Sequence, residues 1–281
     1  MTKTTPYQKL LWVFCLILII SCNKPVETSH KADLNLHENK TLMAIFAHPD
    51  DEIAISPILA KYAKEGANIH LVFVTDGSKG VTEHANIPAG DSLAKVRSEE
   101  ALCLTKTLGI NPPILLNYTD GDLAEYENIY SLDDKINDLF IKHQPNVVIT
   151  FGPGGEYGHS DHRMVSNIVT EVFQREASSS LKQLLYYGFP KELKDNNLVL
   201  KSKVGNWFYE NWKTTQKRFL TYRIPFNNED LELGYKASSC HKSQYTKETV
   251  DDLFSIIKLT DHVIYLRPWN GAKEISTNIF D

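Results

Sequence analysis

The 281-residue chain lacks an excess of positive charge. Its 30 lysines and arginines are outnumbered by 35 aspartates and glutamates, so the formal net charge is -5. Removing residues 1–21, which hold Lys3 and Lys9 and no acid, would make the charge -7. Nucleic-acid-binding domains carry a basic patch or stripe. A mildly acidic chain without such a stripe argues against nucleic acid as a partner.

The chain also lacks an apolar run near its start that is long enough to span a bilayer. Leu10–Ile20 has about 11 residues, whereas a transmembrane helix needs about 20. Because the run follows Lys3 and Lys9, it is typical of the core of a secretory signal peptide.

The signal-like run ends in Ile19-Ile20-Ser21-Cys22, which resembles a bacterial lipobox. In such signals a peptidase cuts before the cysteine, and the cysteine receives a diacylglyceryl group. We therefore predict a signal peptide over residues 1–21, an acylated Cys22 that anchors the protein to a membrane of the cell envelope, and a polar tether over 22–40. A plain signal peptide with an incidental cysteine is the alternative.

Cysteine is scarce, with four residues in the chain. Cys15 would leave with the signal peptide and Cys22 would carry the lipid, so Cys103 and Cys240 remain. A disulfide between them is possible in an oxidising compartment but cannot be deduced from the sequence. The helical pattern around Cys103 favours a small buried hydrophobic side chain instead.

The chain has no visible internal repeat, and from residue 41 strand-like runs alternate with helical patterns. Strands are expected at 41–47, 69–75, 114–116, 146–150, 184–188, 218–223 and 262–266. Helices are expected at 53–65, 92–108, 132–143, 164–175, 231–239 and 249–258, and residues 190–215 look irregular. This alternation predicts one α/β domain over 41–281, a Rossmann-like, mostly parallel sheet with helices on both faces. The C-terminal part could complete the sheet or cover the site.

Polar residues gather directly after these strands. His48-Pro49-Asp50-Asp51-Glu52 follows the first strand, and Asp76, Asp120 and the loop after Thr150 follow others. Ligands of parallel sheets bind outside the carboxyl ends of the strands. Adjacent acids at the end of a buried strand repel one another and lose water, so they stay ionised only beside a positive charge. A divalent metal site is the prediction.

A second cluster, Gly158-His159-Ser160-Asp161-His162, ends the glycine-rich loop after Thr150. The Gly-Lys-Ser/Thr of a phosphate-binding P-loop is missing. The loop is expected to carry ligands into the start of a helix, which Asp161 could cap. Catalytic zinc sites commonly use three His, Asp or Glu ligands and a water. His48, one acid after it and one histidine of the second cluster supply such a set, so we predict a metal hydrolase.

Ala47–Glu52, taken with Gly158–His162, resembles the LmbE-like / PIG-L family of zinc-dependent N-acetylglucosaminyl deacetylases. Further landmarks of that family are Val74–Gly77, Arg97, Glu100, Leu108-Gly109, Thr119–Gly121, Lys236 and His241–Gln244. The resemblance covers roughly residues 41–245. The chain departs from the family pattern at Ser160, where proline is usual, and at Asp76, where asparagine is common.

The resemblance implies that His48, Asp51 and His162 bind Zn²⁺. It makes Asp50 the general base, and it makes His159 the group that, when protonated, stabilises the oxyanion or protonates the reacting groups.

The resemblance also implies that Arg97, Asp120 and Tyr157 contact the substrate. Arg97 could instead form a helix-surface ion pair with Glu100, and Tyr157 could merely pack. Glu52 is expected to support a ligand rather than be one. His241 and Gln244 could close the substrate pocket or simply end a helix.

The implied function is a zinc-dependent hydrolase that removes the acetyl group from an N-acetylated sugar or glycoconjugate, acting outside the cytoplasm in the cell envelope. Two alternatives stay open, an amidase acting on another acyl or conjugated amide and a non-catalytic zinc- or glycan-binding lipoprotein. Asp50 and His159 speak against the binding protein, because a pure binder needs neither beside the ligands.

Overall fold

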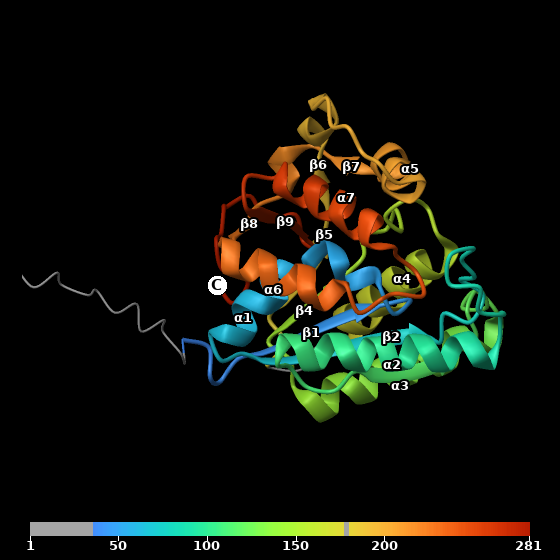
Figure 1. Ribbon diagram of the computed structural model, residues 1–281. Helices are drawn as coiled ribbons and strands as arrows, with labels where there is room; N and C mark the ends of the chain where they lie inside the picture. The colour runs from blue at the N-terminus through green and yellow to red at the C-terminus, as the bar shows by residue number, and fades with distance from the viewer. Residues whose placement is uncertain (1–35, 177–179) are drawn as a thin grey trace, which may run out of the picture. The chain divides into compact units, whose positions relative to one another are not determined.

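A seven-stranded sheet with the order β3-β2-β1-β4-β5-β9-β8 forms the centre of the computed structural model, which describes residues 36–281 apart from 177–179 (Figure 1). Its strands are β1 (Thr41–Phe46), β2 (Asn68–Thr75), β3 (Ile114–Tyr118), β4 (Val147–Thr150), β5 (Gln183–Tyr187), β8 (Tyr222–Pro225) and β9 (Val263–Pro268). The first five strands are parallel, and β9 and β8 continue the sheet in antiparallel fashion. The predicted α/β fold with a mostly parallel sheet is confirmed.

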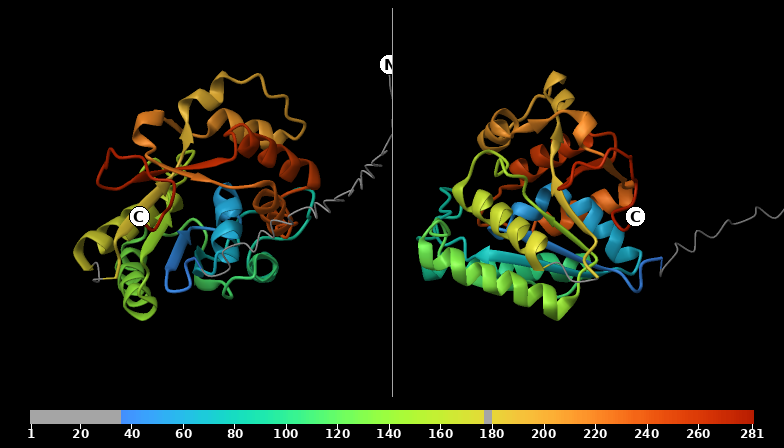
Figure 2. Two further views of the ribbon diagram at one scale, coloured as in Figure 1. Left: turned by 90° about the vertical axis from the view of Figure 1, so that its left-hand side faces the viewer. Right: turned by 180° about the vertical axis from the view of Figure 1, so that it is seen from behind.

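Helices cover both faces of this sheet. They are α1 (Ser56–Lys64), α2 (Asp91–Leu108), α3 (Tyr126–His143), α4 (Ser160–Glu176), α5 (Lys203–Asn211), α6 (Asn228–Ser238) and α7 (Lys247–Lys258). α1, α2 and α6 pack together on one face, and α3 packs against α4 on the other (Figure 2). β1 and β4 therefore read as continuous apolar runs, since both of their faces are buried.

The helix predicted over 53–65 is two elements, the 3₁₀ turn η1 (Asp51–Ile55) and α1. Pro57 lies in the first turn of α1, where its missing N–H costs nothing, so the α-helix begins there and not at Ile53. The helix predicted from Met164 begins earlier, at Ser160. Ser160, which stands where the family usually has proline, is therefore a first-turn residue, and its loop connects directly to the helix.

The segment 190–215 is not irregular. It contains η2 (Lys191–Asp195), α5 and strand β7 (Thr214–Thr215), which pairs with β6 (Phe189–Pro190); the 3₁₀ turn η3 (Lys217–Phe219) follows. Ser202 caps α5 by accepting a hydrogen bond from the Gly205 N–H. A Cβ at Gly205 would lie 2.7 Å from the Asp252 Cβ, so α5 sits closely against α7. The C-terminal part thus both completes the sheet and covers one end of it.

The predicted signal peptide, Cys22 and most of the tether lie outside the described residues. The end of the tether, however, belongs to the domain. His37 is 6% exposed, and the centre of its ring lies 4.8 Å from that of Phe280 and 5.5 Å from that of Tyr62. Its backbone N–H donates a hydrogen bond to the Glu65 carbonyl oxygen. The boundary at residue 41 was therefore too late. No helix of the described part is long and apolar enough to cross a membrane.

Cys103 and Cys240 form a disulfide with a Cα–Cα distance of 5.9 Å. The expectation of a buried, unpaired Cys103 was wrong, because this position lies on the exposed side of α2 and faces the end of α6. The bond joins residues 137 apart in the chain and ties α2 to the segment just after α6.

We expect Cys103→Ser to lower the free energy of unfolding by about 2–4 kcal/mol, because it frees a long loop in the unfolded chain. Urea unfolding with and without reductant measures the effect. Reductant should lower the midpoint of the wild-type protein and leave that of the variant unchanged. Equal midpoints for both oxidised proteins would contradict the prediction.

His70 in β2 is 9% exposed, and its ring lies 4.1 Å from that of His143. Burial, with the charges of His143 and Lys142, lowers the pKa of His70 to about 4. An unfolded histidine titrates near 6.5, so between pH 6.5 and 4 the unfolded chain binds the extra proton. Stability from this group is complete above about pH 6.5 and falls by at most about 3 kcal/mol as the pH drops through that window.

The difference in unfolding free energy between wild type and His70→Phe, measured from pH 7 to 4.5, isolates this contribution from other groups. Exposed His84→Phe serves as the control. The His70 variant should lose less stability on acidification, and parallel pH curves would refute the assignment.

Candidate metal centre

The polar clusters meet at the carboxyl ends of β1, β3 and β4. β1 lies between β2 and β4, and the chain order reverses there, which makes this the topological switch point of the sheet. η1 follows β1, Asp120 follows β3, and α4 begins after the glycine-rich loop that leaves β4. Long-range strand pairing therefore brings motifs more than 100 residues apart into one site.

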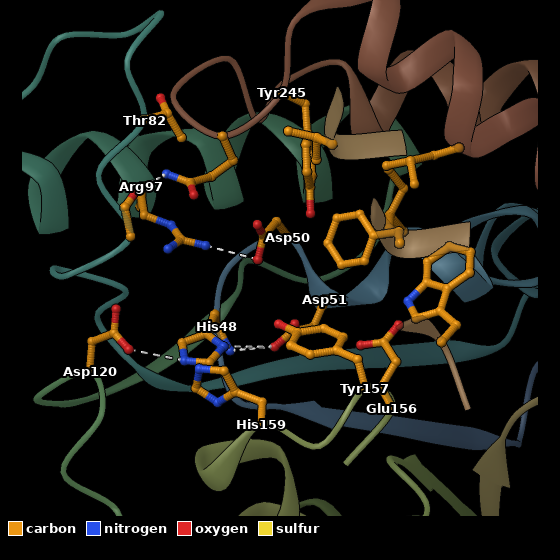
Figure 3. A pocket seen from close by; sticks show the side chains of 17 residues that line it. His48, Asp50, Asp51, Thr82, Arg97, Asp120, Glu156, Tyr157, His159 and Tyr245 are labelled. Atoms are coloured by element: carbon orange, nitrogen blue, oxygen red, sulfur yellow. Dashed lines mark hydrogen bonds and ion pairs between the residues drawn. The ribbon is translucent and has the colours of Figure 1, made fainter. Parts of the chain in front are cut away.

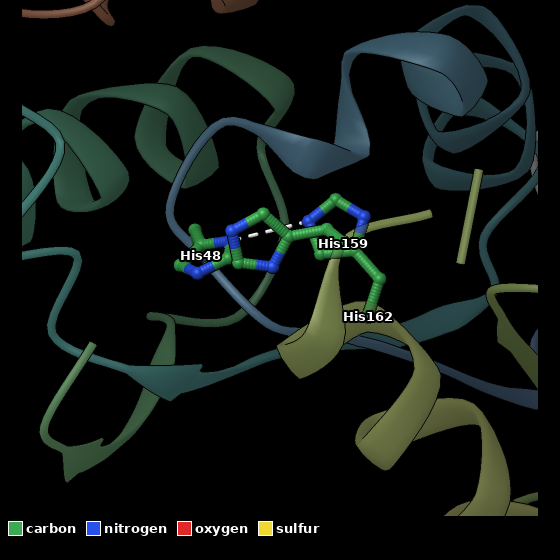
Figure 4. A group of neighbouring side chains, drawn as sticks. All are labelled: His48, His159 and His162. Carbon is green, nitrogen blue, oxygen red and sulfur yellow. Dashed lines mark hydrogen bonds between the residues drawn. The ribbon is translucent and has the colours of Figure 1, made fainter. Parts of the chain in front are cut away.

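Three side chains converge on a single point. His48 Nδ1 lies 3.2 Å from His162 Nε2 (Figure 4). It also lies 3.3 Å from one oxygen of Asp51, and His162 Nε2 lies 3.1 Å from the other. Ligand atoms about 2.0–2.1 Å from a tetrahedral zinc ion are separated by about 3.3 Å. The three separations have the size expected for donors that share one Zn²⁺ ion, with the two Asp51 oxygens each facing one histidine.

The outer nitrogen of each histidine faces another carboxylate. His48 Nε2 lies 3.1 Å from Asp120 and 3.4 Å from Asp161, and His162 Nδ1 lies 3.5 Å from Glu156. Metal-binding histidines commonly use such partners to fix the tautomer and the ring orientation. Glu156 was missed in the sequence because it stands six residues before His162, at a distance that suggests no pairing.

The charge of the set also suits a cation. Burial opposes protonation of both histidines, yet the surrounding carboxylates together outweigh it, Asp51 foremost, raising the pKa of His48 well above its usual value and that of His162 to about 9. The same two rings hold the pKa of Asp51 well below its usual range, against burial. Because metal ligands must be deprotonated, metal binding to these residues is expected to depend on pH.

Asp50 is held differently from Asp51. Its backbone has φ 135°, a strained value for a residue with a side chain, so the two adjacent acids diverge. Its carboxylate lies 2.8 Å from the Arg97 guanidinium, and its N–H donates to Glu52 at 3.1 Å. Burial raises the pKa of Asp50 to about 6, although Arg97 lowers it.

Arg97 does not pair with Glu100. Besides Asp50, it donates to the carbonyl oxygens of Pro49 and Gly77, and its side chain is 3% exposed. It lines the cavity with its charge already used to hold Asp50. Glu100 instead accepts two 2.7 Å hydrogen bonds from Ser243.

Glu52 and His241 form a buried pair below the site. Their side chains are 2.9 Å apart and both are 0% exposed. Because Glu52 also holds the Asp50 N–H, the pair supports the strained backbone. His241 thus lies behind the loop of residues 48–52, whereas Gln244 lines the cavity.

His159 is neutral in this arrangement. Its Nδ1 accepts a hydrogen bond from the Asp161 N–H at 3.2 Å, so the proton of the ring is on Nε2. Burial and the neighbouring histidines lower the pKa of His159, which differs from the protonated form that the resemblance suggested. His159 therefore caps α4, the role expected of Asp161, whose carboxylate instead accepts from Gly121 at 2.7 Å.

Asp120 and Tyr157 both line the cavity, but their contacts differ. One oxygen of Asp120 faces His48 and the other accepts from the Lys79 N–H at 3.0 Å, which lowers the pKa of Asp120 to about 2 despite burial. Asp120 thus orients His48, a predicted metal ligand. Tyr157 packs edge-to-face on His162, with ring centroids 5.2 Å apart.

A cavity with a volume of about 240 Å³ lies above these groups. Figure 3 shows the side chains that line it. Its floor is polar, and its opposite wall is formed by Val204 and Phe208 of α5, Trp212, Tyr245 and Leu253 of α7. Sequence reasoning missed this wall. The aromatic residues between 207 and 212 were the available signal, but nothing local showed that they face the site.

Comparisons with known proteins agree with the geometry. Residues 43–173 match the PIG-L family, GlcNAc-PI de-N-acetylase. Over 156 residues the chain is 28% identical to a 1D-myo-inositol 2-acetamido-2-deoxy-alpha-D-glucopyranoside deacetylase of Mycobacteroides abscessus. The alignment covers 48% of this chain and 56% of the relative, so this chain spans little more than half the length of such relatives.

Solved structures share the fold. N,N'-diacetylchitobiose deacetylase from Pyrococcus horikoshii superimposes with a TM-score of 0.61 at 20% identity, covering 83% of this chain and 84% of that one. A 4-carboxy-2-hydroxymuconate hydratase from Pseudomonas putida reaches 0.56 at 13% identity, covering 85% and 99%. The hydratase shows that this fold alone does not decide the reaction. The match spans both site motifs, so residues 43–173 form the part of the chain that belongs to the PIG-L family.

Proposed function

We propose that this protein is a zinc-dependent hydrolase that removes the acetyl group from an N-acetylated sugar or glycoconjugate. The observation that carries the proposal is the convergence of His48, Asp51 and His162 beside an acid, Asp50, that does not belong to the ligand set. The family match and the deacetylase names of the relatives support the choice of an acetylated amine as substrate.

The three ligands would hold the ion at the floor of the cavity. When bound, zinc lowers the pKa of water and polarises a carbonyl. Asp50 takes one proton from the water that attacks the acetyl carbon, and it holds this proton for the nitrogen that leaves when the C–N bond breaks. Arg97 and the Glu52 contact keep the Asp50 carboxylate in place for both transfers.

His159 acts as a neutral hydrogen-bond donor. With Nδ1 occupied by the Asp161 N–H, its Nε2 proton is available to the oxygen on which negative charge develops.

A purified full-length protein loaded with zinc tests the proposal when incubated with a panel of N-acetyl sugars. Release of acetate in equal amount to free amine is the expected result. Faster release of a longer acyl group from matched amides would favour the amidase, and binding of sugar without any release would favour the non-catalytic protein. Either outcome overturns the proposal.

We further propose that the chain is a lipoprotein of the cell envelope, with a signal peptide over 1–21 and acylation at Cys22. The disulfide between Cys103 and Cys240 supports an oxidising compartment. Labelling of growing cells with radioactive palmitate should mark the wild-type protein and not Cys22→Ser. Equal label in both would refute acylation at this position.

A further inference from the structure

α5 places an aromatic surface beside the opening of the cavity. Tyr157 and Phe208 line the cavity, and the Trp207 ring lies 5.1 Å from the first and 5.3 Å from the second, edge-on to both. Trp207 is 46% exposed, so part of its indole remains open to solvent. Val204, one turn earlier and 41% exposed, extends the same apolar surface into the cavity.

This arrangement differs from an ordinary exposed tryptophan. Single apolar side chains on a surface are common and need no explanation. Trp269 is such a case, because it is 39% exposed and its ring packs on Phe173. It directly follows β9, and its backbone N–H donates a hydrogen bond to the carbonyl oxygen of Leu184 near the start of β5. Trp207, by contrast, packs on Tyr157 and Phe208, which both line the cavity, so the three rings form one aromatic surface that extends from the cavity to solvent.

The size of the cavity determines what must pass this surface. About 240 Å³ is less than the roughly 300–1,000 Å³ typical of sites that enclose a drug-sized ligand. The acetamido group must reach Asp50 and the ligand set at the floor, so one sugar ring fills the space. Any unit linked to that ring lies outside the cavity, next to the rim.

From this geometry we infer that Trp207, with Tyr157 and Phe208, forms a second sugar-binding subsite, so that the substrate is an oligosaccharide or glycoconjugate with at least two pyranose rings. The C–H groups on one face of a pyranose form an apolar surface that packs on the electron-rich face of an aromatic ring. This inference rests on the proposed deacetylase function and adds the size class of its substrate.

The test compares N-acetylglucosamine with its β-1,4-linked disaccharide in wild type, Trp207→Ala and Trp269→Ala. For Trp207→Ala we expect the ratio of kcat/KM for the disaccharide to that for the monosaccharide to fall at least 10-fold. Trp269→Ala should keep the wild-type ratio. An unchanged ratio in Trp207→Ala, or no preference for the disaccharide in wild type, overturns the inference.

Failure of the proposed deacetylase function would give a different result, because neither the wild type nor either variant would then release acetate from either sugar. Binding gives an independent reading. In the Asp50→Asn variant, which should bind substrate without turning it over, we measure the Kd for the β-1,4-linked trisaccharide of N-acetylglucosamine. Adding Trp207→Leu, which keeps an apolar side chain but removes the ring, should raise this Kd at least 10-fold. An unchanged Kd overturns the subsite even if the variant is fully folded.

Discussion

Replacing Asp50 with asparagine is expected to lower kcat/KM for deacetylation by about 100- to 10,000-fold, the range for loss of a general base, while zinc content stays unchanged. The asparagine amide cannot accept the proton of the attacking water. Metal binding should survive, because Asp51 and the two histidines make their contacts without Asp50. Metal analysis and kinetics on the same preparation measure both quantities.

Asparagine is a better choice than alanine for this experiment. The backbone at Asp50 has φ 135°, and asparagine shares with aspartate a greater tolerance for positive φ than alanine has. Asp122→Asn is a matched control, since Asp122 pairs with Lys79 on the surface. Near-normal activity in Asp50→Asn would refute its role as base, and loss of zinc would place it among the ligands.

The substitution His162→Ala should lower the affinity for zinc by more than 100-fold. Changes to the outer hydrogen-bond partners of metal ligands cost less, roughly 10- to 100-fold. The substitution removes one of three donor atoms and leaves Asp51 and Glu156 buried with one fewer positive partner. Titration with a zinc chelator of known affinity measures the change.

Two other variants set the scale for this result. Asp120→Asn changes only the partner of His48 Nε2, so its zinc affinity should fall within the roughly 10- to 100-fold range. His159→Ala removes a histidine from the same loop that we place outside the ligand set, so zinc should stay bound while activity falls. His48, His159 and His162 are also close enough to hold a metal together. Loss of zinc in His159→Ala with retention in His162→Ala would favour that set over ours.

The buried pair of Glu52 and His241 links these experiments to the disulfide. Cys240 immediately precedes His241, and Ser243 to Tyr245 continue to the cavity wall. The disulfide therefore holds the segment that supports Asp50 from behind. Its contribution to stability and its contribution to the site geometry come from the same covalent link.

The sequence alone determined the parallel sheet and the position of the site. Buried parallel strands are continuous apolar runs, and the chemistry follows them within a few residues, as His48–Glu52 does after β1. The end of α2 was equally local, because Gly109 takes φ 71° at the helix terminus. Such features depend on residues close together in the chain.

Only the tertiary structure decided how the site residues divide their work. Arg97 pairs with Asp50, 47 positions away, rather than with the nearby Glu100, and Cys103 pairs with a residue 137 positions away. α5 has an aromatic sequence that is compatible with a core, a surface or the wall of a cavity, and its packing on α7 is accompanied by the last, since Val204 and Phe208 line the cavity. These outcomes depend on which surfaces meet after the sheet has formed, and local spacing holds no information about that.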